Sequence, residues 1–207
     1  MITEQLLQKY PIISDQVTRE RLRIVLVEFE KVLQAGIPGD AVEFGCYVGT
    51  TSLFLRRLFD AYGQSDRREL HVYDSFAGLP EKSTEDSSVA GDQFKAGELN
   101  VSKKQLLHEF HKANLRPPIV HKAWFSQLTD NDVPEHIAFA FLDGDFYDSV
   151  FDSLRLIWPQ LDPEAIVTVD DFGREALPGA ERAVRNFLRD KPGINLRAEH
   201  NIAIIKP

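Results

Sequence analysis

The chain has 207 residues, which suffices for one domain with a substantial core, and its hydrophobic share of 43% and charged share of 27% are ordinary for a globular protein. A formal net charge of -8 argues against the basic surface of a nucleic-acid-binding protein, and the lone Cys46 excludes an internal disulfide framework and fits a reducing compartment. With no apolar run long enough to span a membrane and no secretory pattern at the N-terminus, we expect a single cytoplasmic domain over residues 1–207 with no membrane or nucleic-acid partner.

The N-terminal segment 1–36 is expected to be helical, because residues 17–35 carry apolar side chains at three- and four-residue spacing. These side chains are Leu22, Val25, Leu26, Phe29 and Leu33. Gly36 and Pro38 end the helix. The apolar run Ala41–Phe44 then predicts a strand, which a glycine turn connects to a helix at about Thr51–Phe59.

A second strand, Leu70–Tyr73, is predicted to end at Asp74. Residues 77–102 follow with little periodicity, and so long an irregular stretch is typical of a lid or a binding loop. A helix over Lys103–Ala113 and two strands, Ile119–Lys122 and Ile137–Leu142, are expected next.

The C-terminal third predicts a helix at about Ser149–Leu161 closed by Pro163, a strand over Ala165–Val169 and a helix over Gly179–Arg189. Two last runs, Leu196–Glu199 and Asn201–Lys206, predict a terminal hairpin. Strands that alternate with helices in this way predict an α/β fold, with a mostly parallel sheet covered on both faces.

Acidic side chains gather where the predicted strands end: Glu43, Asp74, Asp143, Asp170 and Asp171. In an open α/β sheet the ligand crevice lies outside the carboxyl ends of the strands. Four separate strands therefore deliver carboxylates to the rim at which a ligand is expected.

The segment from Glu43 to Gly49 (EFGCYVG) links a strand to a helix. Gly45 permits a tight turn, and Gly49 permits close approach of the backbone to a ligand. The carboxylate of Glu43 suits a cationic ligand such as the amino group of a methionine moiety, although the segment also fits an ordinary strand-to-helix turn. Asp74 suits the two hydroxyls of a ribose, or the capping of the turn through Ser75 and Phe76.

Asp143, Asp170 and Asp171 repel one another unless a cation binds or one of them is protonated. Ligands that are all oxygen favour hard ions such as magnesium, and Asp143 can also act as a general base. The alternative is helix capping by Asp145 or Asp148, which does not account for Asp170 and Asp171.

The six histidines carry no zinc-site pattern, since His108 and His111 have no third soft ligand. His121 is the one histidine expected near the crevice. Trp124 and Phe125 follow it, and they can flank an adenine ring or pack in the core.

These segments resemble the macrocin O-methyltransferase family, whose members are magnesium-dependent enzymes that methylate sugar hydroxyls in antibiotic pathways. The resemblance spans roughly residues 20–205 and rests on the glycine turn and on the stretches DSFAGLP (74–80), LDGDFYDS (142–149) and VDDF (169–172). It implies a doubly wound, Rossmann-like class I methyltransferase with a seven-stranded, mostly parallel sheet and a C-terminal antiparallel hairpin. It also implies S-adenosylmethionine and Mg²⁺ as cofactors.

The family's site residues transfer to matching positions of this sequence. Glu43 and Gly45 would hold the methionine part, Asp74 the ribose, and Asp143, Asp170 and Asp171 the metal, with Asp143 as the catalytic base. The expected cofactor contacts also include Tyr47, Gly49, Ser75, Trp124 and Asp143. The N-terminal extension is short for the family, so loop 77–102 is expected to carry acceptor contacts.

The expected acceptor is a small molecule, a sugar or polyol-like part of a secondary metabolite, and its identity is left open. Transfer to a catechol or an amine is an alternative, although catechol enzymes commonly have asparagine as third ligand where this chain has Asp171. A nucleoside-binding protein without turnover is a further alternative. The oligomeric state is open, with a homodimer as one option.

Overall fold

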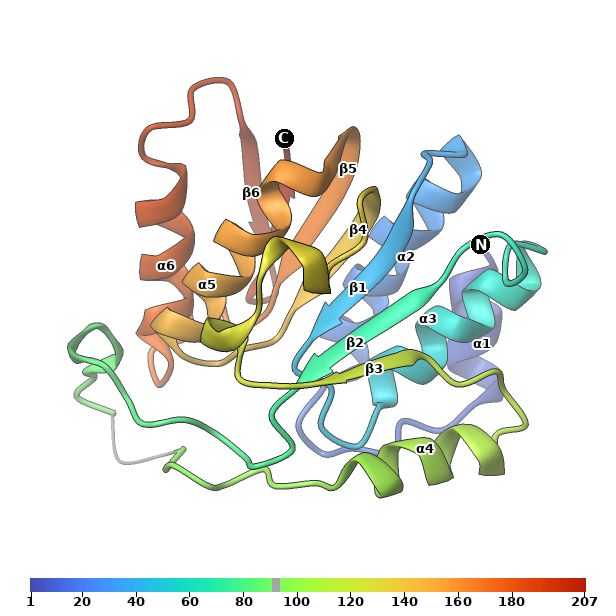
Figure 1. Cartoon of the computed structure of the whole chain (residues 1–207), viewed down its shortest axis with the longest axis horizontal. Coiled ribbons are helices and arrows are strands. Elements are labelled where there is room, and N and C mark those ends of the chain that lie inside the picture. The colour runs from blue at the N-terminus through green and yellow to red at the C-terminus, as the bar shows by residue number, and fades with distance from the viewer. Residues whose placement is uncertain (91–93) are drawn as a thin grey trace.

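The computed structural model describes residues 1–90 and 94–207 (Figure 1). The helices are α1 (Ile2–Lys9), α2 (Arg19–Ala35), α3 (Thr50–Ala61), α4 (Lys103–Lys112), α5 (Tyr147–Ile157) and α6 (Pro178–Leu188). The strands are β1 (Asp40–Phe44), β2 (Leu70–Asp74), β3 (Ile119–Lys122), β4 (Ile137–Leu142), β5 (Leu161–Val169), β6 (Asn195–Glu199) and β7 (Ile202–Lys206).

The strands form one seven-stranded sheet in the order β3-β2-β1-β4-β5-β7-β6. Strands β3, β2, β1, β4 and β5 run parallel, and β7 is antiparallel to both β5 and β6. The order reverses between β1 and β4, which is where open α/β sheets form their ligand crevice. The predicted fold class and the C-terminal antiparallel hairpin are confirmed.

Two apolar clusters cover the two faces of the sheet, because successive side chains of a strand point to opposite sides. In β4, Phe139 and Phe141 join the cluster beneath α2 and α3, whereas Ala140 and Leu142 join the cluster beneath α5 and α6. Figure 1 shows these two helical layers on either side of the sheet. In the described part of the chain, no helix has the length and apolarity needed to cross a lipid bilayer.

The N-terminal segment forms two helices joined by residues 10–18. Thr18 begins α2, since its hydroxyl accepts a hydrogen bond from the backbone N–H of Arg21 at 3.2 Å. Glu30 of α2 holds the start of α1, accepting hydrogen bonds from the backbone N–H groups of Ile2 (2.7 Å) and Thr3 (3.1 Å). The carboxylate therefore satisfies donors that the first turn of a helix leaves unpaired.

The predicted boundaries between α5 and β5 were wrong. Helix α5 begins two residues earlier than expected and ends at Ile157, and β5 already begins at Leu161. Pro163 therefore lies within β5 and does not close the helix. The register on β4 passes from Leu161 directly to Ile166, so Pro163 sits in a bulge where its missing N–H removes no ladder bond.

Candidate active site

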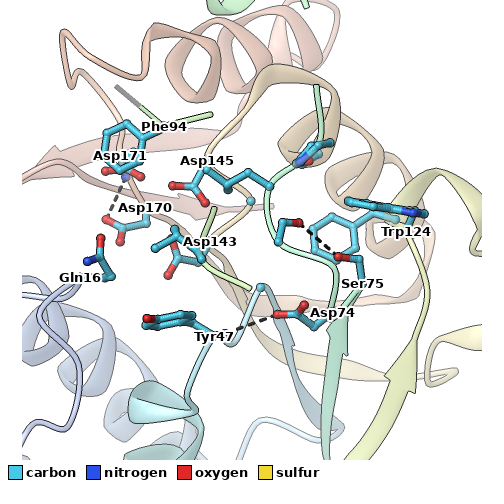
Figure 2. A pocket seen from close by; sticks show the side chains of 18 of the residues that line it. Gln16, Tyr47, Asp74, Ser75, Phe94, Trp124, Asp143, Asp145, Asp170 and Asp171 are labelled. Carbon is cyan, nitrogen blue, oxygen red and sulfur yellow. Dashed lines mark hydrogen bonds between the residues drawn. The ribbon is translucent and has the colours of Figure 1, made fainter. Parts of the chain in front are cut away.

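A cavity opens at the carboxyl ends of β1, β2, β4 and β5, where the acidic residues were expected to meet. The predicted site residues that line it are Gly45, Tyr47, Asp74, Ser75, Trp124, Asp143, Asp170 and Asp171. Figure 2 shows Asp74, Ser75 and Trp124 at one end, and the carboxylates of Asp143, Asp170 and Asp171 at the other.

The glycine turn packs directly against the end of β4. Gly45 has a φ of +84°, and a Cβ atom there would lie 2.1 Å from the carbonyl oxygen of Asp143. The backbone N–H of Asp143 donates in turn to the carbonyl of Phe44 at 2.8 Å. Glycine is therefore required at position 45 both by the left-handed conformation and by this close approach. Tyr47 follows in the same turn with a φ of +46°, an uncommon conformation for an aromatic residue.

Asp74 at the end of β2 holds two turns together. One carboxylate oxygen accepts a hydrogen bond from the backbone N–H of Cys46 at 3.0 Å, and the other accepts from that of Phe76 at 2.7 Å. The turn-capping role considered for Asp74 is therefore present. The first oxygen, Oδ2, also accepts from the backbone N–H of Tyr47 and from the Cys46 thiol, both at 3.4 Å. Each carboxylate oxygen has two lone pairs, so acceptor capacity remains on Oδ1.

Glu43 and Gly49 were expected among the cofactor contacts but do not line the cavity. Glu43 is 1% exposed and accepts a hydrogen bond from the Ser52 hydroxyl beneath the turn. Burial, reinforced by repulsion from Asp74, raises the pKa of Glu43 to about 8. At Gly49, Leu106 of α4 occupies the space that a side chain would fill. A Cβ there would lie 2.4 Å from a Leu106 methyl carbon. The structure thus gives Gly49 a packing role.

The aromatic residues after β3 line the cavity, and one of them also packs in the core. Trp124 and Phe125 both line the cavity, and the Phe125 ring also packs edge-on against Phe44 at 5.2 Å. His121, which was expected near the crevice, is not among the residues that line the cavity. Its ring stacks on Tyr73 with 4.4 Å between centroids, and its Nε2 lies 3.2 Å from Nδ1 of His71.

The three expected metal ligands converge. One oxygen from each of Asp143, Asp170 and Asp171 lies within 4.8 Å of the other two. Burial and mutual repulsion raise the pKa of Asp143 well above its ordinary value, and that of Asp170 to about 7. Oxygens around Mg²⁺, with bonds of about 2.0–2.1 Å, lie roughly 3–4 Å apart, so a small inward movement would bring these three oxygens to the spacing of neighbouring ligands in its shell. The hard oxygen donors and their excess negative charge fit a magnesium-like ion.

A fourth carboxylate, Asp145, lines the same end of the cavity. It was considered as a helix cap, but the N-cap residue of α5 is Phe146, and the first N–H of the helix, that of Tyr147, donates to Asp86 instead. Asp145 has a φ of +58°, and burial together with repulsion from Asp171 and Asp170 raises its pKa well above the ordinary value. The sequence signal for Asp145 was its spacing from Asp143 in the stretch Asp-Gly-Asp. Two aspartates that face one cavity repel each other, and this repulsion is costly without a function.

Two arginines that the sequence did not single out neutralise part of this charge. Arg21 of α2 donates from Nη1 to Oδ1 of Asp170 (2.9 Å) and to Oδ1 of Asp171 (3.1 Å). Arg174 donates to the same oxygen of Asp171 at 2.8 Å. Full ionisation of the four aspartates at this end, against two guanidinium groups, leaves two negative charges, which one divalent cation would balance.

Loop 77–102 is hydrogen-bonded to itself near its two ends, and Asp86 links it to the start of α5. The backbone N–H of Leu79 donates to the carbonyl of Glu98 at 2.8 Å, and the buried Asp86 accepts a hydrogen bond from the N–H of Tyr147 at 2.8 Å. Phe94 lies beneath the Arg174 guanidinium, 5.1 Å from ring centre to carbon. Residues 91–93 of the predicted lid lie outside the described residues, and its closure stays a prediction.

Comparisons with known proteins agree with this architecture. Residues 9–200 match the family model described as Macrocin-O-methyltransferase (TylF). The chain is 34% identical over 171 residues to 8-demethyl-8-(2,3-dimethoxy-alpha-L-rhamnosyl)-tetracenomycin-C 4'-O-methyltransferase of Streptomyces olivaceus, over 80% of this chain and 64% of that protein. It is 28% identical to mycinamicin III 3''-O-methyltransferase of Micromonospora griseorubida, over 91% of this chain and 75% of that protein.

Among solved structures, the fold is similar to that of the O-methyltransferase NovP, with a TM-score of 0.77 and 24% identity over 90% of this chain and 79% of that chain. The chain therefore spans less than two thirds of the Streptomyces olivaceus protein and a larger share of the other two.

Proposed function

The chain belongs to the macrocin O-methyltransferase family, and we propose that it transfers the methyl group of S-adenosylmethionine to a hydroxyl of a small-molecule acceptor. One observation carries this proposal. A single cavity holds the strand-end carboxylate of Asp74 at one end and three carboxylates within 4.8 Å of one another at the other. A nucleoside and a hard cation are the ligands that these two ends suit, and metal-assisted O-methyl transfer uses both side by side.

The adenosine of the cofactor would lie at the end of the cavity formed by Asp74, Ser75 and Trp124. Asp74 still has acceptor capacity for the ribose hydroxyls, and the glycine turn that it braces gives Gly45 and Tyr47 to the cavity wall. We propose that the methionine part runs past this turn toward Asp143. Glu43 would act from beneath the turn, fixing its shape through Ser52.

Asp143, Asp170 and Asp171 would hold a magnesium ion, whose chemistry is to bind the acceptor oxygen and ease loss of its proton. In the proposed reaction the acceptor hydroxyl gives its proton to a carboxylate, and its oxygen forms a bond to the methyl carbon. The sulfonium sulfur keeps the electron pair of the broken bond, which yields S-adenosylhomocysteine and a methyl ether. The protein's part is to align oxygen, carbon and sulfur and to keep them in that geometry.

Asp143 and Asp145 are the two candidates for the base. The sequence favoured Asp143, but a carboxylate that binds a metal holds a proton less well. Asp145 lies at the same end of the cavity, outside the cluster of three ligand atoms. The Mn²⁺ affinity and the turnover of Asp145→Asn separate them. Asp145→Asn should keep Mn²⁺ affinity and lose turnover if Asp145 is the base, whereas turnover retained in Asp145→Asn assigns the proton to Asp143.

The acceptor is proposed to be a sugar or polyol-like part of a secondary metabolite, in an antibiotic pathway. Both curated relatives carry names of O-methyltransferases for antibiotics, one of which is a rhamnosyl tetracenomycin. A cytoplasmic location is proposed as well, since the free Cys46 suits a reducing compartment. Methyl transfer to a catechol or an amine is the second candidate within the same fold, and an acceptor panel decides between them.

Methyl transfer from S-adenosylmethionine to glycosylated acceptors, matched aglycones, a catechol and an amine is the deciding assay. We expect methylation of a glycosylated acceptor that EDTA abolishes, while calorimetry shows S-adenosylhomocysteine affinity largely unchanged in EDTA. Asp171→Asn should lose turnover, and Asp148→Asn serves as the matched control because Asp148 is exposed and outside the cavity lining. Full activity in EDTA would refute the metal, and absence of S-adenosylhomocysteine binding would refute the cofactor.

A further inference from the structure

Arg21 occupies the position between two of the carboxylates that would hold the metal. Its Nη1 donates to one oxygen of Asp170 and one oxygen of Asp171, at 2.9 and 3.1 Å, and its side chain is only 11% exposed. These are two of the three residues in the candidate metal cluster. A cation that bridges two metal-site carboxylates stands where the divalent ion would be most strongly attracted.

The position of Arg21 is tied to the segment that joins α1 to α2. Its Nη2 donates to the backbone carbonyl of Gln16, and Gln16 itself lines the cavity near the carboxylates (Figure 2). Arg19, two residues earlier, reaches back to the carbonyl of Leu7 in α1 at 2.8 Å. Movement of the Arg21 side chain out of the cluster therefore breaks a contact that helps to hold residues 16–21 against the cavity.

Arg174 makes a different set of contacts with the cluster. It pairs with Asp171 alone, from a side chain that is 37% exposed and lies over Phe94. Arg174 contacts the same Asp171 oxygen as Arg21 but does not reach Asp170, so it competes with a metal at one ligand only. Arg21 bridges both carboxylates and cannot share them with a divalent ion without strong repulsion between the two cations.

We propose that Arg21 is an internal counter-ion of the metal site, which holds Asp170 and Asp171 together without metal and must leave them when a divalent cation binds. Metal loading then costs the contacts of Arg21 and loosens residues 16–21, next to the end of the cavity proposed for the acceptor. This inference rests on the proposed metal site, and it makes the N-terminal segment responsive to metal. The alternative is that Arg21 orders the ligands and stays in place.

Calorimetric titration of Mn²⁺ into the cofactor-free protein distinguishes the two roles. Arg21→Gln should bind Mn²⁺ about tenfold more tightly than the wild type or better, because the competing charge is gone, and Arg21→Lys should fall between them. Arg23→Gln is the matched control, since Arg23 lies on the same helix and pairs with the exposed Glu4. It should bind Mn²⁺ within about twofold of the wild type. Equal or weaker Mn²⁺ binding by Arg21→Gln would overturn the proposal.

Two further measurements keep the inference testable if Arg21→Gln is less stable without metal. The rise in melting temperature on addition of Mn²⁺ should be larger in Arg21→Gln than in the wild type. If Arg21 has a purely structural role, the variant melts at a lower temperature both with and without Mn²⁺, and the rise is the same as in the wild type. Hydrogen exchange in residues 10–22 of the wild type should increase with Mn²⁺, and unchanged exchange counts against displacement. If neither the wild type nor any variant binds Mn²⁺, the metal site itself is refuted. If the wild type and Arg21→Gln bind Mn²⁺ equally well, only the role of Arg21 as a counter-ion is refuted.

Discussion

Gly45 is the position where one added methyl group should damage both ends of the cavity. An alanine there keeps a φ of +84°, which costs a residue with a side chain about 1–2 kcal/mol. Its Cβ would also lie 2.1 Å from the carbonyl oxygen of Asp143, a backbone atom that cannot rotate away. The turn and the end of β4 must therefore separate, at an added cost of about 1–3 kcal/mol by analogy with overpacked cores.

Gly36 provides the matched control, because it has a φ of +69° at the end of α2 and open space where its Cβ would be. Urea unfolding of Gly36→Ala measures the backbone cost alone, and the extra destabilisation of Gly45→Ala measures the clash. Calorimetry should show weaker S-adenosylhomocysteine binding for Gly45→Ala only. Displacement of Asp143 by about 1 Å should lower turnover by about a hundredfold. Equal stability of the two variants, with cofactor affinity intact in both, would refute the reasoning.

Three other outcomes can be measured with single variants or none. Asp74→Ala should weaken S-adenosylhomocysteine binding by about 1–3 kcal/mol through loss of the ribose hydrogen bonds, and unchanged calorimetric affinity would exclude that role. Glu43 has its folded-state pKa raised to about 8 from an ordinary 4.5, so the stability tied to its neutral form is complete below about pH 4.5 and is lost as pH rises through about 8. The unfolding free energy of the wild type should therefore fall relative to Glu43→Gln between about pH 5 and 9, and a pH-independent difference contradicts the shift. Hydrogen exchange in loop 77–102 should slow when cofactor and acceptor bind, and equal protection in the free protein would rule out a lid.

Features that depend on local pattern were predicted well. Strands β3 and β4 have the bounds expected from their apolar runs, and the two short runs at the end of the chain indicated the terminal hairpin. The carboxylates at strand ends converge because parallel strands end at one edge of the sheet, a property of topology that the alternating pattern already implies. Gly45 was singled out for its turn, and its φ of +84° confirms that conformation.

Features that depend on distant contacts could not be predicted. Nothing in the periodicity of α2 separates Arg21, which contacts residues about 150 positions later, from the other charged residues on the same helix. The packing of Gly49 against Leu106 likewise requires α4 to lie over the turn. Pro163 was interpreted as a helix stop because proline ends helices, but a bulge in β5 accepts the same residue.

The four aspartates at the metal end also explain why this part of the fold should tolerate loss of a metal but not loss of an arginine and the metal together. Asp145 and Asp171 have left-handed backbone conformations, with φ values of +58° and +57°, so backbone strain and charge repulsion are concentrated within one small region. Strain of this kind persists only where surrounding contacts hold it in place. Arg21 and Arg174 both supply such contacts, at the same oxygen of Asp171. In the proposed displacement a divalent ion would replace the first of them with a stronger attraction, and part of the binding energy of the metal would then release the N-terminal segment.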